Sequence, residues 1–296
     1  MATVLDECHR FYLERAPVRG TWVRLSNSIS DMFSHHSYPE VVAQALAELS
    51  CTAVALADAL KFEGDLIMQA QSDGDSFLKL LAVEVSDQLL YRGVAKLDEE
   101  QLCPARVPAL LADCQRLVLT IAPKHDAQQY QSIVALNTDG IAAMLEGYLK
   151  DSQQVPSAMR ITWQANVATA LLLQKLPTHS AEEDEAWRRS LSLFNTLSTE
   201  ELAELPAQDL LYRLFHEEQV RLHPARSVGF YCPCSNARVA KALRLIGEAE
   251  CRDILAERGQ IDVHCDYCNK PYQFAEADLY ALFSGQAVYE PAPTRH

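Results

Sequence analysis

Apolar residues recur every three or four positions between residues 40 and 60. They are Val42, Leu46, Leu49, Ala53, Leu56 and Leu60. This period predicts a helix with a buried face, and Tyr38-Pro39 places a proline at its first turn. Gln44, Glu48 and Asp58 interrupt the apolar run, so we expect a core helix rather than a membrane span.

Strand-like segments surround this helix in the chain. The expected strands are residues 21–25, 66–71, 77–85, 88–97, 117–122 and 130–137, with a turn at residues 72–75. Residues 141–150 and 163–173 are expected to be helical, the second ending near Pro177. This order of elements predicts an α+β core domain, an antiparallel sheet with helices, over residues 1–177.

The pattern changes between residues 178 and 229. An acidic run at 182–185 begins one expected helix, Ser198-Thr199-Glu200-Glu201 is a capping box for another, and residues 210–215 form a third. These helices are short, are broken at Pro206 and depend on tertiary packing. The residues alone are equally consistent with an ordinary helical bundle and with a metastable helical linker.

Four cysteines at the end of the chain form two close pairs. Cys232 and Cys234 precede an expected helical region, residues 237–258, and Cys265 and Cys268 follow it after a short strand at 260–264. Two such pairs provide the four thiolates that Zn²⁺ prefers at tetrahedral corners. The sequence therefore predicts a small four-cysteine zinc domain over residues 230–285, followed by a flexible tail, 286–296. Cysteines that merely line a core, and a static zinc ribbon without a redox role, are the alternatives.

His264 lies beside a predicted ligand. Neighbouring residues of a strand point to opposite faces, so we expect this imidazole to lie outside the metal shell. The prediction is one zinc ion per chain, bound by the four thiolates alone.

Charge and cysteine content narrow the functional class. The 296 residues carry a formal net charge of -14, which disfavours nucleic acid and anionic membrane as partners. The first residues lack an apolar signal core, and nine cysteines in a chain without an export signal favour the reducing cytoplasm. The other cysteines, at positions 8, 51, 103, 114 and 251, are expected to be small buried residues.

The sequence around the four cysteines resembles the redox-regulated 33 kDa chaperonin family. The segments that carry the resemblance are Phe230-Tyr231-Cys232-Pro233-Cys234-Ser235, residues 261–268, Tyr272-Gln273-Phe274, residues 214–218, 18–25 and 61–64. The resemblance extends over essentially the whole chain.

This resemblance implies an ATP-independent holdase that is inactive when it is reduced and zinc-bound. It implies that oxidation pairs Cys232 with Cys234 and Cys265 with Cys268, expels zinc and unfolds the linker at 178–229. The spacing shows only that such disulfides could form. The family pattern also implies that the activated chain forms a homodimer and binds unfolded proteins. The apolar linker residues that would meet these clients are Trp187, Leu191, Phe194, Leu214 and Phe215.

Two functions from other classes remain open. A thiol-disulfide oxidoreductase could use Cys265-Asp266-Tyr267-Cys268, although no thioredoxin-like strand and helix surround that pair. A zinc-ribbon regulator that binds nucleic acid is disfavoured, because the cysteine region has no basic face. No arrangement of residues nominates a catalytic site, so we expect a chaperone rather than an enzyme.

Overall fold

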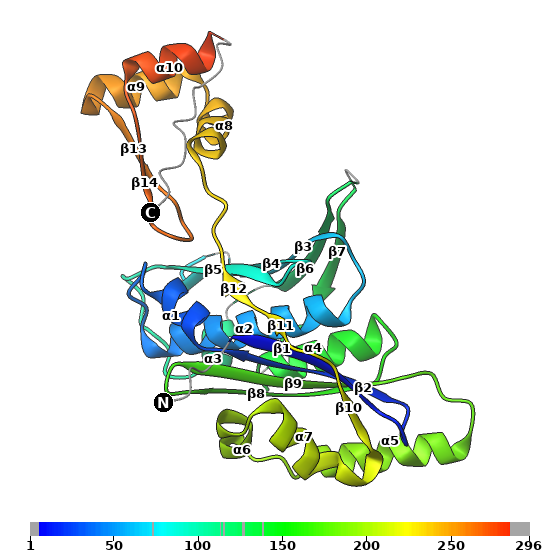
Figure 1. Cartoon of the computed structure of the whole chain (residues 1–296). Helices are drawn as coiled ribbons and strands as arrows, with labels where there is room; N and C mark the ends of the chain where they lie inside the picture. The colour runs from blue at the N-terminus through cyan, green and yellow to red at the C-terminus, as the bar shows by residue number, and fades with distance from the viewer. Residues whose placement is uncertain are drawn as a thin grey trace. The chain divides into compact units, whose positions relative to one another are not determined.

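The computed structural model describes residues 6–284, except 73, 113, 115, 126, 127 and 138. The chain divides into two compact units, Met1–Tyr231 and Cys232–His296. Figure 1 shows the elements of both units, and each unit is described by itself. The predicted tail, 286–296, lies outside the described residues.

The first unit contains two sheets. Sheet A has the order β10-β1-β2-β9-β8, with β11 also pairing with β1, and all of these pairs are antiparallel. Its strands are β1 (Glu7–Leu13), β2 (Val18–Leu25), β8 (Ser157–Gln164), β9 (Val167–Lys175), β10 (Val220–Leu222) and β11 (Arg226–Ser227). Segments from both ends of this unit therefore form one sheet.

Sheet B contains most of the strands expected from the sequence. Its order is β12-β5-β4-β3-β6-β7, antiparallel except for the β12–β5 pair. Its strands are β3 (Gly64–Gln71), β4 (Leu78–Ser86), β5 (Leu90–Leu97), β6 (Arg116–Pro123), β7 (Tyr130–Val134) and β12 (Gly229–Phe230). The strands predicted at 66–71, 77–85, 88–97 and 117–122 are confirmed, and the one at 130–137 is shorter than expected.

Helix α2 (Glu40–Ala59) lies between the two sheets and contacts strands of both (Figure 1). It is the one described helix that is long and apolar enough to cross a membrane, but 78% of its most apolar window is buried within the protein. The predicted core helix is thus confirmed. The first unit also contains three shorter helices, α1 (Asn27–Phe33), α3 (Val107–Ala112) and α4 (Ile141–Asp151).

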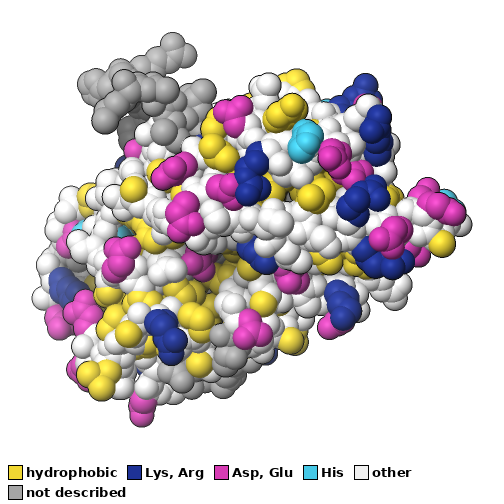
Figure 2. Space-filling model, turned by 90° about the horizontal axis from the view of Figure 1, so that it is seen from below, with side chains coloured by type: hydrophobic (Ala, Val, Ile, Leu, Met, Phe, Trp, Pro, Cys, Tyr) yellow, Lys and Arg dark blue, Asp and Glu magenta, His cyan; other side chains and the backbone are white. Residues whose placement is uncertain are grey.

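The other face of sheet A is covered by the helices of residues 181–215. These are α5 (Ala181–Phe194), α6 (Thr199–Glu204) and α7 (Ala207–Phe215), followed by the 3₁₀ turn η1 (His216–Glu218). Figure 2 views the protein from the side on which Figure 1 places these helices and shows charges of both signs scattered among apolar side chains. Beneath them, Phe11 packs at 6.3 Å from the ring of Phe215. The Phe11 ring also lies over Gly20, where a Cβ would come within 2.1 Å of it.

The expected helix at residues 163–173 is wrong. Residues 157–175 form the β8–β9 hairpin instead. Leu171 and Leu173 face helices α5–α7, whereas Ala170 and Leu172 face the core that contains α2. A strand that is buried on both faces has an unbroken apolar run, and periodicity alone cannot separate such a run from a buried helix.

The expected linker, residues 178–229, contains strands as well as helices. Its three predicted helices form, and Ser198 and Glu201 make the predicted capping box. After α7 the chain pairs with sheet A through β10 and β11, and then with sheet B through β12. Residues 178–229 belong to the same compact unit as residues 1–177, and their separate domain boundary stays a prediction.

The second unit is small. It contains α8 (Asn236–Ile246), α9 (Glu248–Arg258), α10 (Glu276–Phe283) and a hairpin of β13 (Ile261–His264) and β14 (Pro271–Phe274). The Ser235 hydroxyl caps α8 by accepting from the backbone N–H of Arg238. Eight buried residues make its core.

Candidate metal centre

The four cysteines come from two places in the second unit. Cys232 and Cys234 lie in the segment before helix α8, and Ser235, next in the chain, is the N-cap of that helix. Cys234 thus lies beside the positive end of the α8 dipole, which favours a thiolate.

Cys265 and Cys268 lie in the turn of the β13–β14 hairpin. The backbone N–H of Cys265 donates to the carbonyl of Lys270 at 3.0 Å, and the N–H of Asn269 donates to the carbonyl of Cys265 at 2.8 Å. Asn269 takes a left-handed φ of 52°, which asparagine tolerates better than most residues. These bonds fold the turn back on itself and bring both sulfur atoms to the same end of the hairpin.

The structure places all four sulfur atoms within 4.8 Å of one another. The Sγ atoms of Cys232 and Cys265 are 3.6 Å apart, and those of Cys234 and Cys268 are 3.3 Å apart. Thiolates about 2.3 Å from a tetrahedral zinc ion would lie about 3.8 Å from one another. The cluster therefore has a size that can hold a metal ion, and each cysteine is half-buried.

Burial opposes ionisation at two of the thiols. It raises the pKa of Cys232 and raises that of Cys268 further. Burial also raises the pKa of Cys234, but the neighbouring Tyr272 hydroxyl and the other three thiols outweigh it and leave that pKa below its usual value. The cluster thus contains one thiol that is predisposed to ionise and two that would need a cation.

Tyr272 supplies an independent indication that a metal fits. Its hydroxyl is buried and has no hydrogen-bond partner among the described residues. Its neighbour is the Cys234 sulfur, and the pKa of the hydroxyl is raised by burial and by that contact. A metal-bound thiolate is a better hydrogen-bond acceptor than a thiol, so a loaded centre would satisfy this hydroxyl.

The comparisons with known proteins identify the family. The model of the Hsp33 protein family matches residues 6–275. The chain belongs to the Hsp33 family. A 33 kDa chaperonin of Chromobacterium violaceum is 39% identical over 292 residues, 98% of each chain. Another, of Methylobacillus flagellatus, is 38% identical over 295 residues, 99% of each chain.

A solved member of the Hsp33 family has the same fold. The crystal structure of the 33 kDa chaperonin of Thermotoga maritima matches with a TM-score of 0.79 at 19% identity, over 95% of this chain and 98% of that one. The α+β class with a C-terminal cluster of four cysteines is thereby confirmed. Membership of the Hsp33 family supports a chaperone function.

The five predicted client-binding residues of this Hsp33 family member lie together, but they are not displayed. Trp187, Phe194, Leu214 and Phe215 are buried and Leu191 is partly buried, all in the layer between sheet A and helices α5–α7.

An ionic cluster around Asp58 was not predicted from the sequence. This fully buried carboxylate accepts from Arg10 at 2.8 Å and from Arg226 at 2.6 Å. The three residues are far apart in the chain, so no local pattern could reveal the cluster. Arg226 lies in strand β11, which precedes Cys232 in the chain.

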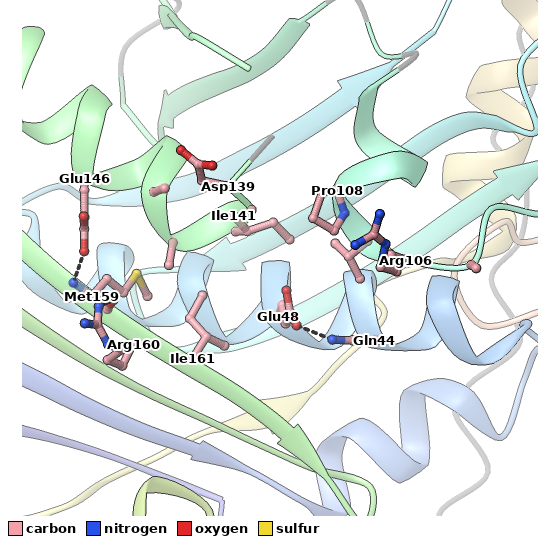
Figure 3. A pocket seen from close by; sticks show the side chains of 15 residues that line it. Gln44, Glu48, Arg106, Pro108, Asp139, Ile141, Glu146, Met159, Arg160 and Ile161 are labelled. Atoms are coloured by element: carbon pink, nitrogen blue, oxygen red, sulfur yellow. Dashed lines mark hydrogen bonds between the residues drawn. The ribbon is translucent and has the colours of Figure 1, made fainter. Parts of the chain in front are cut away.

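A cavity of about 520 Å³ lies between α2, α3, α4 and β8 (Figure 3). Burial raises the pKa of Glu48 in its wall, against a hydrogen bond from Gln44. Glu146 accepts from the backbone N–H of Met159 at 2.6 Å. The lining of the cavity contains no residue predicted to be functional, and the carboxylates of Glu48 and Glu146 have hydrogen-bond partners within the protein.

Proposed function

We propose that this protein is a redox-regulated holdase chaperone of the cytoplasm. In the reduced state one zinc ion is bound by Cys232, Cys234, Cys265 and Cys268, and the chain is inactive. Oxidation forms two disulfides, releases zinc and unfolds the linker, which then binds unfolding proteins and prevents their aggregation. The activated chain forms a homodimer and needs neither ATP nor a catalytic site.

The observation that carries the proposal is the four-thiol cluster. Its sulfur spacing approximates a tetrahedral zinc site, and four soft thiolates favour zinc over hard cations. The four ligands come from two chain segments, so a bound ion would join the turn before α8 to the β13–β14 turn. The names of the relatives support the chaperone part of the proposal.

The oxidation step balances with a two-electron oxidant such as a peroxide. Each pair of thiolates loses two electrons and forms one S–S bond, while the peroxide takes up those electrons with protons and becomes water. Two equivalents of peroxide oxidise all four thiolates, and Zn²⁺ leaves unchanged. We assign the disulfides to Cys232–Cys234 and Cys265–Cys268.

Loss of zinc should unfold the second unit. A structural zinc contributes about 10–16 kcal/mol in zinc-finger peptides. A domain of this size rarely obtains more than about 3–5 kcal/mol from its core, and this core has eight buried residues. Disulfides between near neighbours close very short loops, so they restrict the unfolded chain little. They also leave the two metal-binding segments unconnected, whereas zinc joined them.

Release of the linker would uncover the client-binding layer. Phe194, Leu214 and Phe215 are buried against strands of sheet A, so separation of the helices from the sheet exposes apolar surface on both. Exposed contiguous apolar surface is what an unfolding protein can bind. The same burial would explain why the reduced chain is inactive.

One experiment tests the proposal. Aggregation of a thermally unfolding model protein is followed by light scattering with the reduced and with the peroxide-treated chain, while released zinc is measured with a chromogenic chelator. We expect protection only after oxidation, with one zinc released per chain. Peptide mapping without reductant should recover the two assigned disulfides. Equal protection by both forms would refute redox control, and cross-links between the two pairs would refute the pairing.

A further inference from the structure

Arg24 of strand β2 carries a buried positive charge. Its side chain lies in the interior at 8% exposure. Glu7 lies opposite it on strand β1 and its charge acts on the guanidinium, although the described residues form no ion pair with Arg24. Burial lowers the pKa of this guanidinium, although it remains charged. A buried charge is costly unless its hydrogen bonds are satisfied.

The main acceptors of Arg24 are backbone carbonyls at the end of helix α6. The two N–H groups of its Nη2 are shared among the carbonyls of Leu202 at 3.2 Å, Ala203 at 2.9 Å and Leu205 at 2.8 Å. The last carbonyls of a helix have no partner within it and carry its negative dipole end. The end of helix α6 and the charge of Glu7 therefore compensate the charge of Arg24.

Pro206 explains why this helix needs an outside donor. In a continuing helix the N–H of residue 206 would bond to the carbonyl of Leu202, but proline has no N–H. Helix α6 ends at Glu204 after six residues, and a helix of this length is not stable alone. Arg24 supplies the donor that the local sequence omits.

The other side of the guanidinium is fixed to the core. Nε donates to the hydroxyl of Thr169 in β9 at 3.3 Å, and the group lies 4.8 Å from the centre of the Trp22 ring. The N-terminus of α6 is capped by its own residues, Ser198 and Glu201. The two ends of the helix thus differ, because one is stabilised within the linker and the other by the core sheet.

We propose that Arg24 is a positioning residue by which sheet A holds the linker, and that it sets how readily helices α6 and α7 leave the core. The inference rests on the proposed function for its regulatory meaning. All three carbonyl bonds are lost together when α6 leaves, since they converge on one nitrogen. Detachment of α6 therefore removes the contribution of Arg24 in a single step.

The test uses the full, reduced, zinc-loaded chain and hydrogen exchange read by peptide mass spectrometry. Arg24→Met removes the donors but keeps a long side chain, and Arg24→Lys keeps the charge without the planar fork. Arg19→Met is the matched control, because Arg19 lies on the same strand but bonds to Gln174 of β9. For Arg24→Met we expect hydrogen exchange of residues 199–215 to accelerate about tenfold or more. This factor corresponds to the free energy that is lost with a charge-assisted hydrogen bond.

Arg24→Lys should give a smaller increase, and Arg19→Met should leave residues 199–215 unchanged. Peptides from residues 236–283 and the zinc content should match the unsubstituted chain in every variant. Unchanged exchange of residues 199–215 in Arg24→Met would overturn the inference, as would an equal rise across sheet B. This exchange experiment needs only the reduced protein. Its outcome is therefore independent of the client-protection assay that tests the proposed function. If Arg24→Met does not fold, the comparison of Arg24→Lys with Arg19→Lys decides in the same way.

Discussion

The guanidinium of Arg226 is hydrogen-bonded to the fully buried carboxylate of Asp58, with 2.6 Å between Nη1 and Oδ1. Asp58 lies in the last turn of helix α2, and Arg226 lies in strand β11, which precedes Cys232 in the chain. A second bond joins Nη2 of Arg226 to the carbonyl of Asp87 at 2.9 Å. The last part of the linker is thereby tied to the core by a charge.

Replacement of Asp58 by Asn should destabilise the first unit. Arg10 and Arg226 would both lose their ionic partner, which we expect to lower the free energy of unfolding by about 2–3 kcal/mol. Urea denaturation followed by circular dichroism measures this change. Asp98→Asn is the control, because its ion pair with Lys79 lies nearer the surface, and its effect should be clearly smaller. Equal decreases in the free energy of unfolding for the two variants would show that burial does not strengthen the ion pairs of Asp58.

Replacement of His264 by Ala should leave the metal content intact. The His264 side chain is exposed, whereas the four thiols converge on one another. Inductively coupled plasma mass spectrometry should find one zinc ion per chain in this variant, as in the unsubstituted protein. The Cys268→Ala variant should lose most of its zinc. Substantial loss of zinc from the His264 variant would refute the all-thiolate shell.

Replacement of Tyr272 by Phe should weaken metal retention without unfolding the hairpin. The hydroxyl of Tyr272 has the Cys234 sulfur as its neighbour, and partners of this kind typically change metal affinity by about 10- to 100-fold. Transfer of zinc to a competing chelator should be correspondingly faster. Tyr280→Phe provides the control, because that ring is 65% exposed on α10. Identical transfer rates for the two variants would show that the Tyr272 hydroxyl does not support the centre.

Zinc binding should release protons and weaken at low pH. The raised pKa values of Cys232 and Cys268 mean that these thiols are protonated at neutral pH in the metal-free chain. They must lose their protons to bind zinc, so affinity falls as the pH decreases. Calorimetry at pH 7 in buffers of different ionisation enthalpy should give about two to four protons released per zinc. A value near zero would mean that the thiols are already ionised without metal.

A chain that ends at residue 177 tests the predicted domain boundary. The core around α2 is built almost entirely from earlier residues, so we expect cooperative thermal unfolding to persist. Phe11, Trp22 and Leu171 would lose the helices that cover them, so stability should decrease and binding of an apolar dye should increase. Calorimetry and dye fluorescence measure these effects. An insoluble product would show that the linker helices are integral to the core.

Local sequence patterns predicted the elements whose signals are themselves local. The period of residues 40–60 and the capping box at Ser198 correspond to observed elements, and the strands on either side of the predicted turn at 72–75 pair antiparallel. The spacing of the cysteines likewise predicted their convergence, because each pair lies in one short segment.

Features that depend on distant pairing were not predictable. Strands β10 to β12 have two or three residues each and exist only through partners far away in the chain. The run at 167–175 was misassigned, because burial on both faces removes the alternation that marks a strand. The neighbourhood of Tyr272 and Cys234 depends on the fold of the whole second unit, and no spacing rule reveals it.

The position of β1 also has a consequence for biosynthesis. This strand, formed by residues 7–13, pairs with β2 on one side and with β10 and β11 on the other. Its outer edge therefore stays open on the ribosome until residues 220–227 emerge. Pairings of such long sequence separation form slowly, and open strand edges invite association with other chains. This member of a chaperone family would thus be most vulnerable to aggregation while it is being made.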